Sequence, residues 1–167
     1  MILLKQVLVA TDFSPASEAA LAYGRALART FGASLHVLHI VENSFMRPTT
    51  SDPQAIMATK TRTLNQLLTE DDRRSLGGAR AVIEVSDSPA QAIAQYAKTE
   101  AIDLIVIGTH GRGAVSQLLV GSVAERVVRI APCPVLTVRH PEHEFVLPDS
   151  PEQRGGHDSP QENSRRN

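Results

Sequence analysis

The chain has 167 residues, of which 42% are hydrophobic and only 4% aromatic, and its formal net charge is −1. This length suffices for one domain with a proper core, built from Ala, Val, Leu and Ile, and the near-neutral charge argues against a nucleic-acid partner. No apolar stretch approaches the roughly 18 residues of a membrane span, so we expect no membrane partner. The single cysteine, Cys133, excludes an internal disulfide framework, and a cytoplasmic protein is the simplest inference.

The first part of the chain predicts a strand, a helix and a second strand. Residues 3–10 form an apolar run rich in Val and Leu, as in a buried strand. Ser14 and Pro15 are typical of a helix start, with serine as the cap and proline at the first helical position. Gly32 ends this helix, and Ser34–Val41 is the second strand.

The middle of the chain predicts a loop, two helices and a third strand. Residues 42–53 are polar and contain two prolines, which indicates a loop. Residues 54–76 have leucines at helical spacing and predict one long helix, ended by a pair of glycines. Residues 80–85 are the third strand, and the Ser-Pro pair at the start of residues 88–99 begins another helix.

A glycine loop lies between the last two predicted strands. Residues 104–107 are an apolar fourth strand that ends abruptly at Gly108. The loop after it is followed by an amphipathic helix over residues 123–130 and by the fifth strand, Val135–Val138.

The composition changes at His140. Proline, acidic residues, Ser, Gln and Arg dominate the sequence from there on. Such a segment has too little apolar surface to offset the entropy of ordering it. We therefore expect one domain over residues 1–140 and a disordered tail over residues 141–167.

Strands and helices alternate throughout, which predicts an α/β fold with a parallel sheet and helices on both faces. The expected architecture is a doubly wound five-stranded parallel sheet of order 3-2-1-4-5. Strands 1 and 4 then lie side by side where the order reverses, and ligands of such sheets bind in the crevice at that point. The turn at Thr11 and Asp12 and the loop at Gly108 would line this crevice.

The spacing of the loop glycines favours a phosphate site. Two residues separate Gly108 from Gly111, nine separate Gly111 from Gly121, and Ser122 follows. Backbone N–H groups between a strand and a helix can hold a phosphate, and Ser122 can cap the helix or donate its hydroxyl to that phosphate. The GxxxxGK[ST] and GxGxxG loops do not fit this sequence. The alternative is that the glycines only end a strand and start a helix.

Three motifs, in order and with matching spacing, resemble the universal stress protein family. GTHGRGAVSQLLVGS resembles that family's G-2x-G-9x-G-S/T nucleotide loop, VLVATDFSPAS its first strand and turn, and APCPVLTVR its last strand. The similarity runs from about Lys5 to Arg139. It implies an adenine nucleotide alpha hydrolase-like fold, binding of ATP, ADP or AMP in a stress response, and a homodimer.

The candidate nucleotide-binding residues come from both turns at the crevice. They are Ala10, Thr11, Asp12, Val41, Gly108, Gly111, Arg112, Gly113, Gly121, Ser122 and Val123. Loop and helix-start amides would hold phosphates. Arg112 would add a cation or be a solvated loop arginine. Asp12 would bind ribose or a Mg²⁺ on the phosphates, or simply favour the helix start. The resemblance implies that the Val41 backbone reads the adenine edge, flanked by Ala10 and Thr11.

Three functions remain open at this point. The first is a nucleotide-binding regulatory module. The second is a slow ATPase, because Asp12 and His110 are the only candidates for a base. The third is a dimeric interaction protein with an empty loop. Residues 134–139 would form the dimer contact, since pairing covers an apolar sheet edge. Asp87 stands where the family often has glycine, and its charge would repel phosphates.

Overall fold

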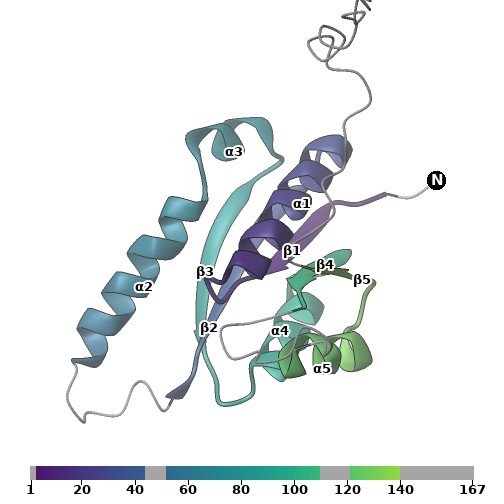
Figure 1. Ribbon diagram of the computed structural model, residues 1–167. Coiled ribbons are helices and arrows are strands. Elements are labelled where there is room, and N and C mark those ends of the chain that lie inside the picture. The colour runs from purple at the N-terminus through teal and green to yellow at the C-terminus, as the bar shows by residue number, and fades with distance from the viewer. Residues whose placement is uncertain (1–2, 44–51, 110–120, 140–167) are drawn as a thin grey trace, which may run out of the picture.

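A computed structural model describes residues 3–43, 52–109 and 121–139 (Figure 1). Its elements are β1 (Gln6–Ala10), α1 (Pro15–Phe31), β2 (Ser34–Val41), α2 (Pro53–Leu67), α3 (Glu70–Ser75), β3 (Ala79–Val85), α4 (Pro89–Thr99), β4 (Leu104–Gly108), α5 (Ser122–Ile130) and β5 (Val135–Val138). The predicted tail and most of the predicted loop over residues 42–53 lie outside the described residues.

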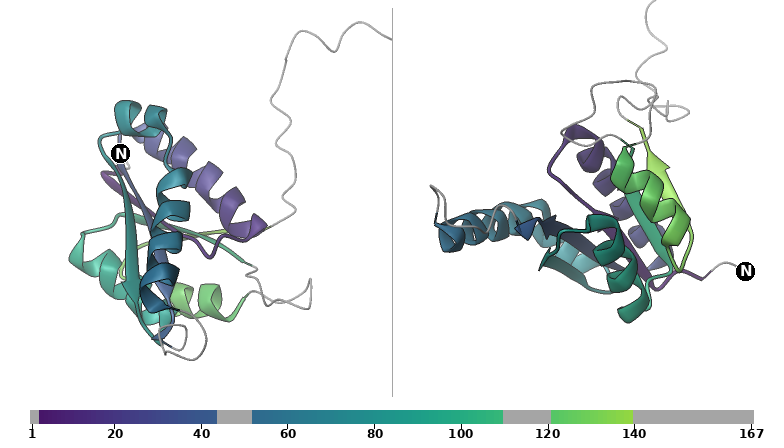
Figure 2. Two further views of the ribbon diagram at one scale, coloured as in Figure 1. Left: turned by 90° about the vertical axis from the view of Figure 1, so that its left-hand side faces the viewer. Right: turned by 90° about the horizontal axis from the view of Figure 1, so that it is seen from below.

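The five strands form one parallel sheet of order β3-β2-β1-β4-β5, which confirms the predicted fold and topology. Helices cover both faces of the sheet (Figures 1 and 2). Val7 and Val9 of β1 pack in the core that contains α1 and α2, whereas Leu8 and Ala10 pack against α4 and α5. Alternate residues of a strand point to opposite faces, so a strand covered on both faces is apolar throughout. We call these two sides the α1 face (α1–α3) and the α4 face (α4 and α5).

Helix α1 begins and ends as its sequence predicts. The Ser14 side chain accepts a hydrogen bond from the Ser17 backbone N–H, and Pro15 is the first helical residue. Gly32 ends the helix with φ of 64°, and its N–H bonds to the carbonyls of the last turn. Glycine adopts this left-handed conformation without a Cβ penalty, which explains the sharp stop.

The prediction of one helix over residues 54–76 is wrong. Helix α2 ends at Leu67, and Thr69 begins α3 with a capping box in which its side chain and that of Asp72 bond to each other's backbone N–H. Asp72 is fully buried, and Arg25 of α1 donates to it over 2.7 Å. Burial raises the pKa of Asp72, but the hydrogen bonds from Arg25 and Thr69 outweigh it and hold the pKa below its ordinary value. A helical leucine pattern hides this break, because capping residues fit a helix sequence as well.

Helix α5 begins one residue earlier than predicted, at Ser122, and Gly121 occupies the cap position. Ser122 is the first helical residue and glycine at the cap position has no side chain, so the option that Ser122 caps the helix is wrong. Helix α4 has Ser88 at its cap position, also without a side-chain hydrogen bond to the helix. In neither helix of the α4 face does the residue at the cap position provide a side-chain cap.

Strand β5 ends the sheet order and is an edge strand, as predicted. The carbonyls of Pro134 and Val138 accept hydrogen bonds from β4 residue Ile105 and from Thr109. Backbone groups alternate in direction along a strand, so those of Val135 and Thr137 point to the open edge. None of the described helices is both long and apolar enough to cross a membrane.

Candidate functional site

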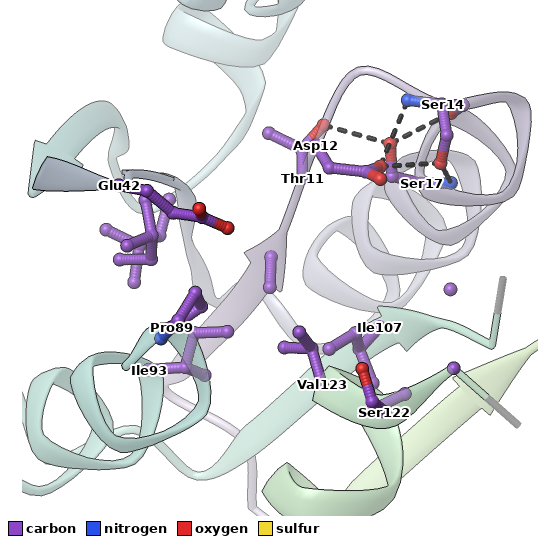
Figure 3. Close-up of a pocket in the computed structure, with 16 residues that line it drawn as sticks. Thr11, Asp12, Ser14, Ser17, Glu42, Pro89, Ile93, Ile107, Ser122 and Val123 are labelled. Carbon is purple, nitrogen blue, oxygen red and sulfur yellow. Dashed lines mark hydrogen bonds between the residues drawn. The ribbon is translucent and has the colours of Figure 1, made fainter. Parts of the chain in front are cut away.

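A cavity of about 420 Å³ lies where the strand order reverses (Figure 3). It spans the carboxyl ends of β2, β1 and β4 and the first turns of α1, α4 and α5. Its lining residues are Ala10, Thr11, Asp12, Ser14, Ser17, Leu38, Ile40, Glu42, Pro89, Ile93, Ile107, Gly108, Gly121, Ser122, Val123 and Ala124. The position is the one at which doubly wound sheets bind ligands, and the size suits a small organic molecule.

The structure brings together seven of the candidate residues. Those that line the cavity are Ala10, Thr11, Asp12, Gly108, Gly121, Ser122 and Val123. Val41 is buried outside the lining, and its carbonyl accepts a hydrogen bond from the Ser86 N–H over 2.9 Å. Gly111, Arg112 and Gly113 lie outside the described residues, as does His110.

The sequence analysis missed the apolar wall and one acidic side chain of the cavity. Leu38, Ile40 and Glu42 alternate along the end of β2, while Pro89 and Ile93 come from the first turns of α4. Successive side chains of a strand point to opposite faces of the sheet, so residues 38, 40 and 42 share one face and Val41 lies on the other. This alternation is the sequence signal for Leu38, Ile40 and Glu42. The part played by α4 depends on how that helix packs on the sheet, which sequence spacing does not give.

The turn after β1 is held from several sides. The Thr11 N–H bonds to Leu38 of β2, and the Thr11 carbonyl accepts a hydrogen bond from Nδ1 of buried His39 over 2.8 Å. Phe13 adopts φ of 64°, unusual for a residue with a side chain, and its ring lies 4.3 Å from that of His39. Strained backbone of this kind persists where surrounding contacts fix it, and it is common at ligand sites.

Asp12 is oriented by the cap of α1. Both the N–H and the hydroxyl of Ser14 donate to the same oxygen of its carboxylate. The described residues contain no group of three or more His, Cys, Asp or Glu side chains that would hold a metal. Asp12 therefore fits a Mg²⁺ only if the phosphates of a ligand supply other oxygens, which is how Mg²⁺ is usually held beside nucleotides.

The junction of β4 and α5 presents backbone to the cavity. A Cβ on Gly108 would lie 2.7 Å from the Ala16 backbone, so glycine is required for β4 to end against the first turn of α1. The Gly121 N–H donates to the Thr109 carbonyl and fixes the start of α5. The N-terminus of α5 is the positive end of the helix dipole, and glycine at its cap position provides no side-chain acceptor. Backbone N–H groups in such a first turn favour an anion.

The end of β2 is fixed to the segment before α4. Asn43 donates both its backbone N–H and its side-chain amide to the Asp87 carboxylate, over 3.2 and 3.0 Å. Asp87 is exposed and does not line the cavity. The described lining residues include two carboxylates, Asp12 and Glu42, and no lysine or arginine.

Both histidines of β2, His36 and His39, are buried. His36 is 1% exposed and bonds to the Tyr96 hydroxyl and to the Gln6 side-chain oxygen, both over 2.9 Å. Burial, with a smaller effect of Arg80, lowers the pKa of His36 to about 4. His36 therefore links β2 to α4 as a neutral group, away from the cavity.

Cys133 is half-buried, and burial raises the pKa of its thiol, consistent with an inert cysteine.

Comparison with known proteins identifies close similarities over almost the whole described chain. The model of the universal stress protein family matches residues 4–139. A universal stress protein from Thermus aquaticus is 37% identical over 139 residues, which cover 82% of this chain and 100% of the relative.

Two solved structures show the same fold. UspA from Lactobacillus plantarum is 28% identical with a TM-score of 0.71, covering 83% of this chain and 100% of its own. The universal stress protein from Archaeoglobus fulgidus in complex with dAMP is 26% identical with a TM-score of 0.58, covering 83% and 99%. The resemblance seen in the three motifs, and the fold that it implies, are confirmed.

Proposed function

Because the chain belongs to the universal stress protein family, we propose that it is an adenine-nucleotide-binding regulatory module of the stress response, acting in the cytoplasm as a homodimer. The ligand is ATP, ADP or AMP, and the bound state rather than turnover carries the signal. The cavity at the sheet's reversal is the observation that supports this most. The relative in complex with dAMP supports an adenine nucleotide as the ligand.

The chemistry of the lining suggests how the nucleotide lies. The start of α5 offers backbone N–H groups at Ser122 and Val123, and α1 is less suitable because Ser14 already caps it. The start of α4 is apolar, with Pro89 lacking an N–H altogether. Phosphates therefore belong at the β4–α5 end, the ribose over β1, and the base between β2 and α4.

We expect residues outside the described ranges to contribute to this site as well. Arg112 and the amides of Gly111 and Gly113 would add to the phosphate end, and a Mg²⁺ held by Asp12 and the phosphates would offset the charge of the carboxylates. The Ile40 backbone is better placed than that of Val41 to bind the edge of the base, because Ile40 lines the cavity and the Val41 carbonyl already accepts a hydrogen bond from Ser86.

Two measurements test the proposal. Mass spectrometry of the purified protein should detect a carried-over adenine nucleotide, and calorimetry should show micromolar-range binding of ATP, ADP or AMP. Gly121→Val places a branched side chain at the phosphate end and should abolish binding. Ala22→Val introduces the same side chain on the exposed side of α1 and should bind normally. Failure of the wild-type protein to bind any of the three nucleotides would refute the proposal and favour the interaction protein with an empty loop.

The dimer has its own test at the sheet edge. Thr137→Pro removes an N–H that points to the open edge, so it should block pairing with a second copy while leaving the β4–β5 bonds intact. Light scattering should then show a monomer. Thr137→Val keeps the N–H and should remain dimeric. A wild-type protein that is monomeric at high concentration would contradict the edge pairing.

A further inference from the structure

Glu42 has a distinctive place in the cavity. It follows β2, on the same side as Pro89 and Ile93 and across from Ser122 at the start of α5 (Figure 3). Within residues 3–43, 52–109 and 121–139 its carboxylate makes no hydrogen bond or ion pair, whereas the Asp12 carboxylate is bonded to Ser14.

The backbone on both sides of Glu42 is anchored. The Val41 carbonyl accepts from the Ser86 N–H, and Asn43 makes two hydrogen bonds to Asp87. These bonds join the end of β2 to the segment that leads into α4, so the two walls of this part of the cavity are fixed to each other. The backbone at Glu42 is thus fixed before any ligand arrives, so only its side-chain rotamer has to be ordered on binding, which lowers the cost of using it for recognition.

We propose that Glu42 selects the base, by accepting a hydrogen bond from the exocyclic amine of adenine. An ionised carboxylate is an acceptor only, so it requires a donor on the ligand. Pro89 and Ile93 lie on the same side of the cavity as Glu42 (Figure 3), and Ile40 also lines it, so their apolar surfaces suit the faces of a flat ring. A base edge without an amine would give this carboxylate no donor and would therefore bind more weakly.

The order of the strands separates this contact from the ribose and the phosphates. The cavity crosses β2, β1 and β4 in that order, with Glu42 after β2, Asp12 after β1 and the start of α5 beyond β4. With strands about 4.8 Å apart, the ends of β2 and β4 are separated by about 10 Å. A phosphate at α5 therefore places the ribose near Asp12 and the base near Glu42. This inference rests on the proposed nucleotide site.

A thermodynamic cycle tests the contact by combining one change in the ligand, removal of the amine, with one change in the protein, Glu42→Ala. AMP and its analogue without the amine, purine riboside 5′-monophosphate, are titrated into the wild-type protein and into Glu42→Ala. Removing the amine should cost about tenfold in affinity in the wild type and less than about twofold in Glu42→Ala. The Glu42 carboxylate repels the phosphate of both ligands equally, so this repulsion cancels when the two affinities are compared. Glu42→Gln keeps an acceptor and should retain part of the discrimination.

Two controls sharpen the cycle. Glu18→Ala removes one negative charge from the exposed side of α1 and should keep the wild-type preference. The same cycle with 2′-deoxy-AMP should show no coupling to Glu42. Two results would overturn the assignment while leaving the nucleotide site intact. One is coupling between Glu42 and the 2′-hydroxyl, and the other is an equal loss of affinity on removal of the amine in the wild type and in Glu42→Ala. A wild-type protein that binds neither ligand would instead overturn the nucleotide site itself.

Discussion

The two faces of the sheet are held by different interactions. On the α1 face, side chains cap all three helices, namely Ser14 for α1, Asp52 for α2 and Thr69 for α3. On the α4 face, the structure shows no side-chain cap for α4 or α5 from the residues that it describes. The polar anchors differ as well, because α3 is joined to α1 by a buried ion pair and α4 is joined to β2 by a neutral hydrogen bond.

This difference supports the proposal that stability and binding depend on different faces of the sheet. A capped helix start has its N–H groups engaged, whereas an uncapped start leaves them for a ligand. The α1 face thus behaves mainly as the scaffold, and contributes Ser14 and Ser17 at the start of α1 to the cavity. The α4 face supplies the cavity with an apolar wall from α4 and with backbone donors from α5.

The largest expected effect is on the buried anchor of the α1 face. Asp72→Ala removes a capping-box member and leaves Arg25 without its partner, so unfolding free energy should fall by about 3–5 kcal/mol. Asp71→Ala removes an exposed partner of Arg29 and should cost less than about 1 kcal/mol. Urea unfolding measures both, and equal losses would show that the buried pair is not an anchor.

The second-largest effect is expected on acidification, which should lower the free energy of unfolding through His36, the residue that joins β2 to α4. The pKa of His36 is about 4 in the folded protein and ordinarily 6.5, so the unfolded chain takes up a proton first as the pH falls. The stabilisation is complete above pH 6.5 and is lost towards pH 4, by roughly 3 kcal/mol. Asp72 keeps its contribution in this window, because its pKa is lowered from 3.8.

The variant His36→Gln isolates this effect. Glutamine does not titrate, so the fall in unfolding free energy between pH 6.5 and 4 should become shallower in urea melts. His39→Gln is the matched change at the other buried histidine of β2. An unchanged slope in His36→Gln would contradict the assignment.

The smallest effect compares the helix starts directly. Ser14→Ala removes a cap and should cost about 1 kcal/mol, whereas Ser88→Ala removes a serine whose side chain makes no cap bond and should cost only a few tenths. Thermal melts at neutral pH without nucleotide measure both. If Ser88→Ala destabilised the protein as much as Ser14→Ala, the contrast between the faces would not hold.

The strand order and the meeting of the two turns could be predicted from sequence because they follow from alternation and topology alone. Asp12 and Gly108 are 96 residues apart, yet Asp12 follows β1 and Gly108 ends β4, two strands that lie side by side. Glu42 was missed because its role depends on which side of β2 faces the cavity. The break at Thr69 was missed because a capping box inside a leucine pattern resembles one continuous helix.

The central claim is that the uncapped start of α5 receives the phosphate of a nucleotide. The most direct measurement follows the backbone amide resonances by NMR while AMP or adenosine is added. The account predicts that Ser122 and Val123 shift with AMP and much less with adenosine, while the capped Gln54 and Asp72 amides stay unchanged with both. Equal shifts at Ser122 and Val123 with the two ligands, or none with AMP, would contradict it.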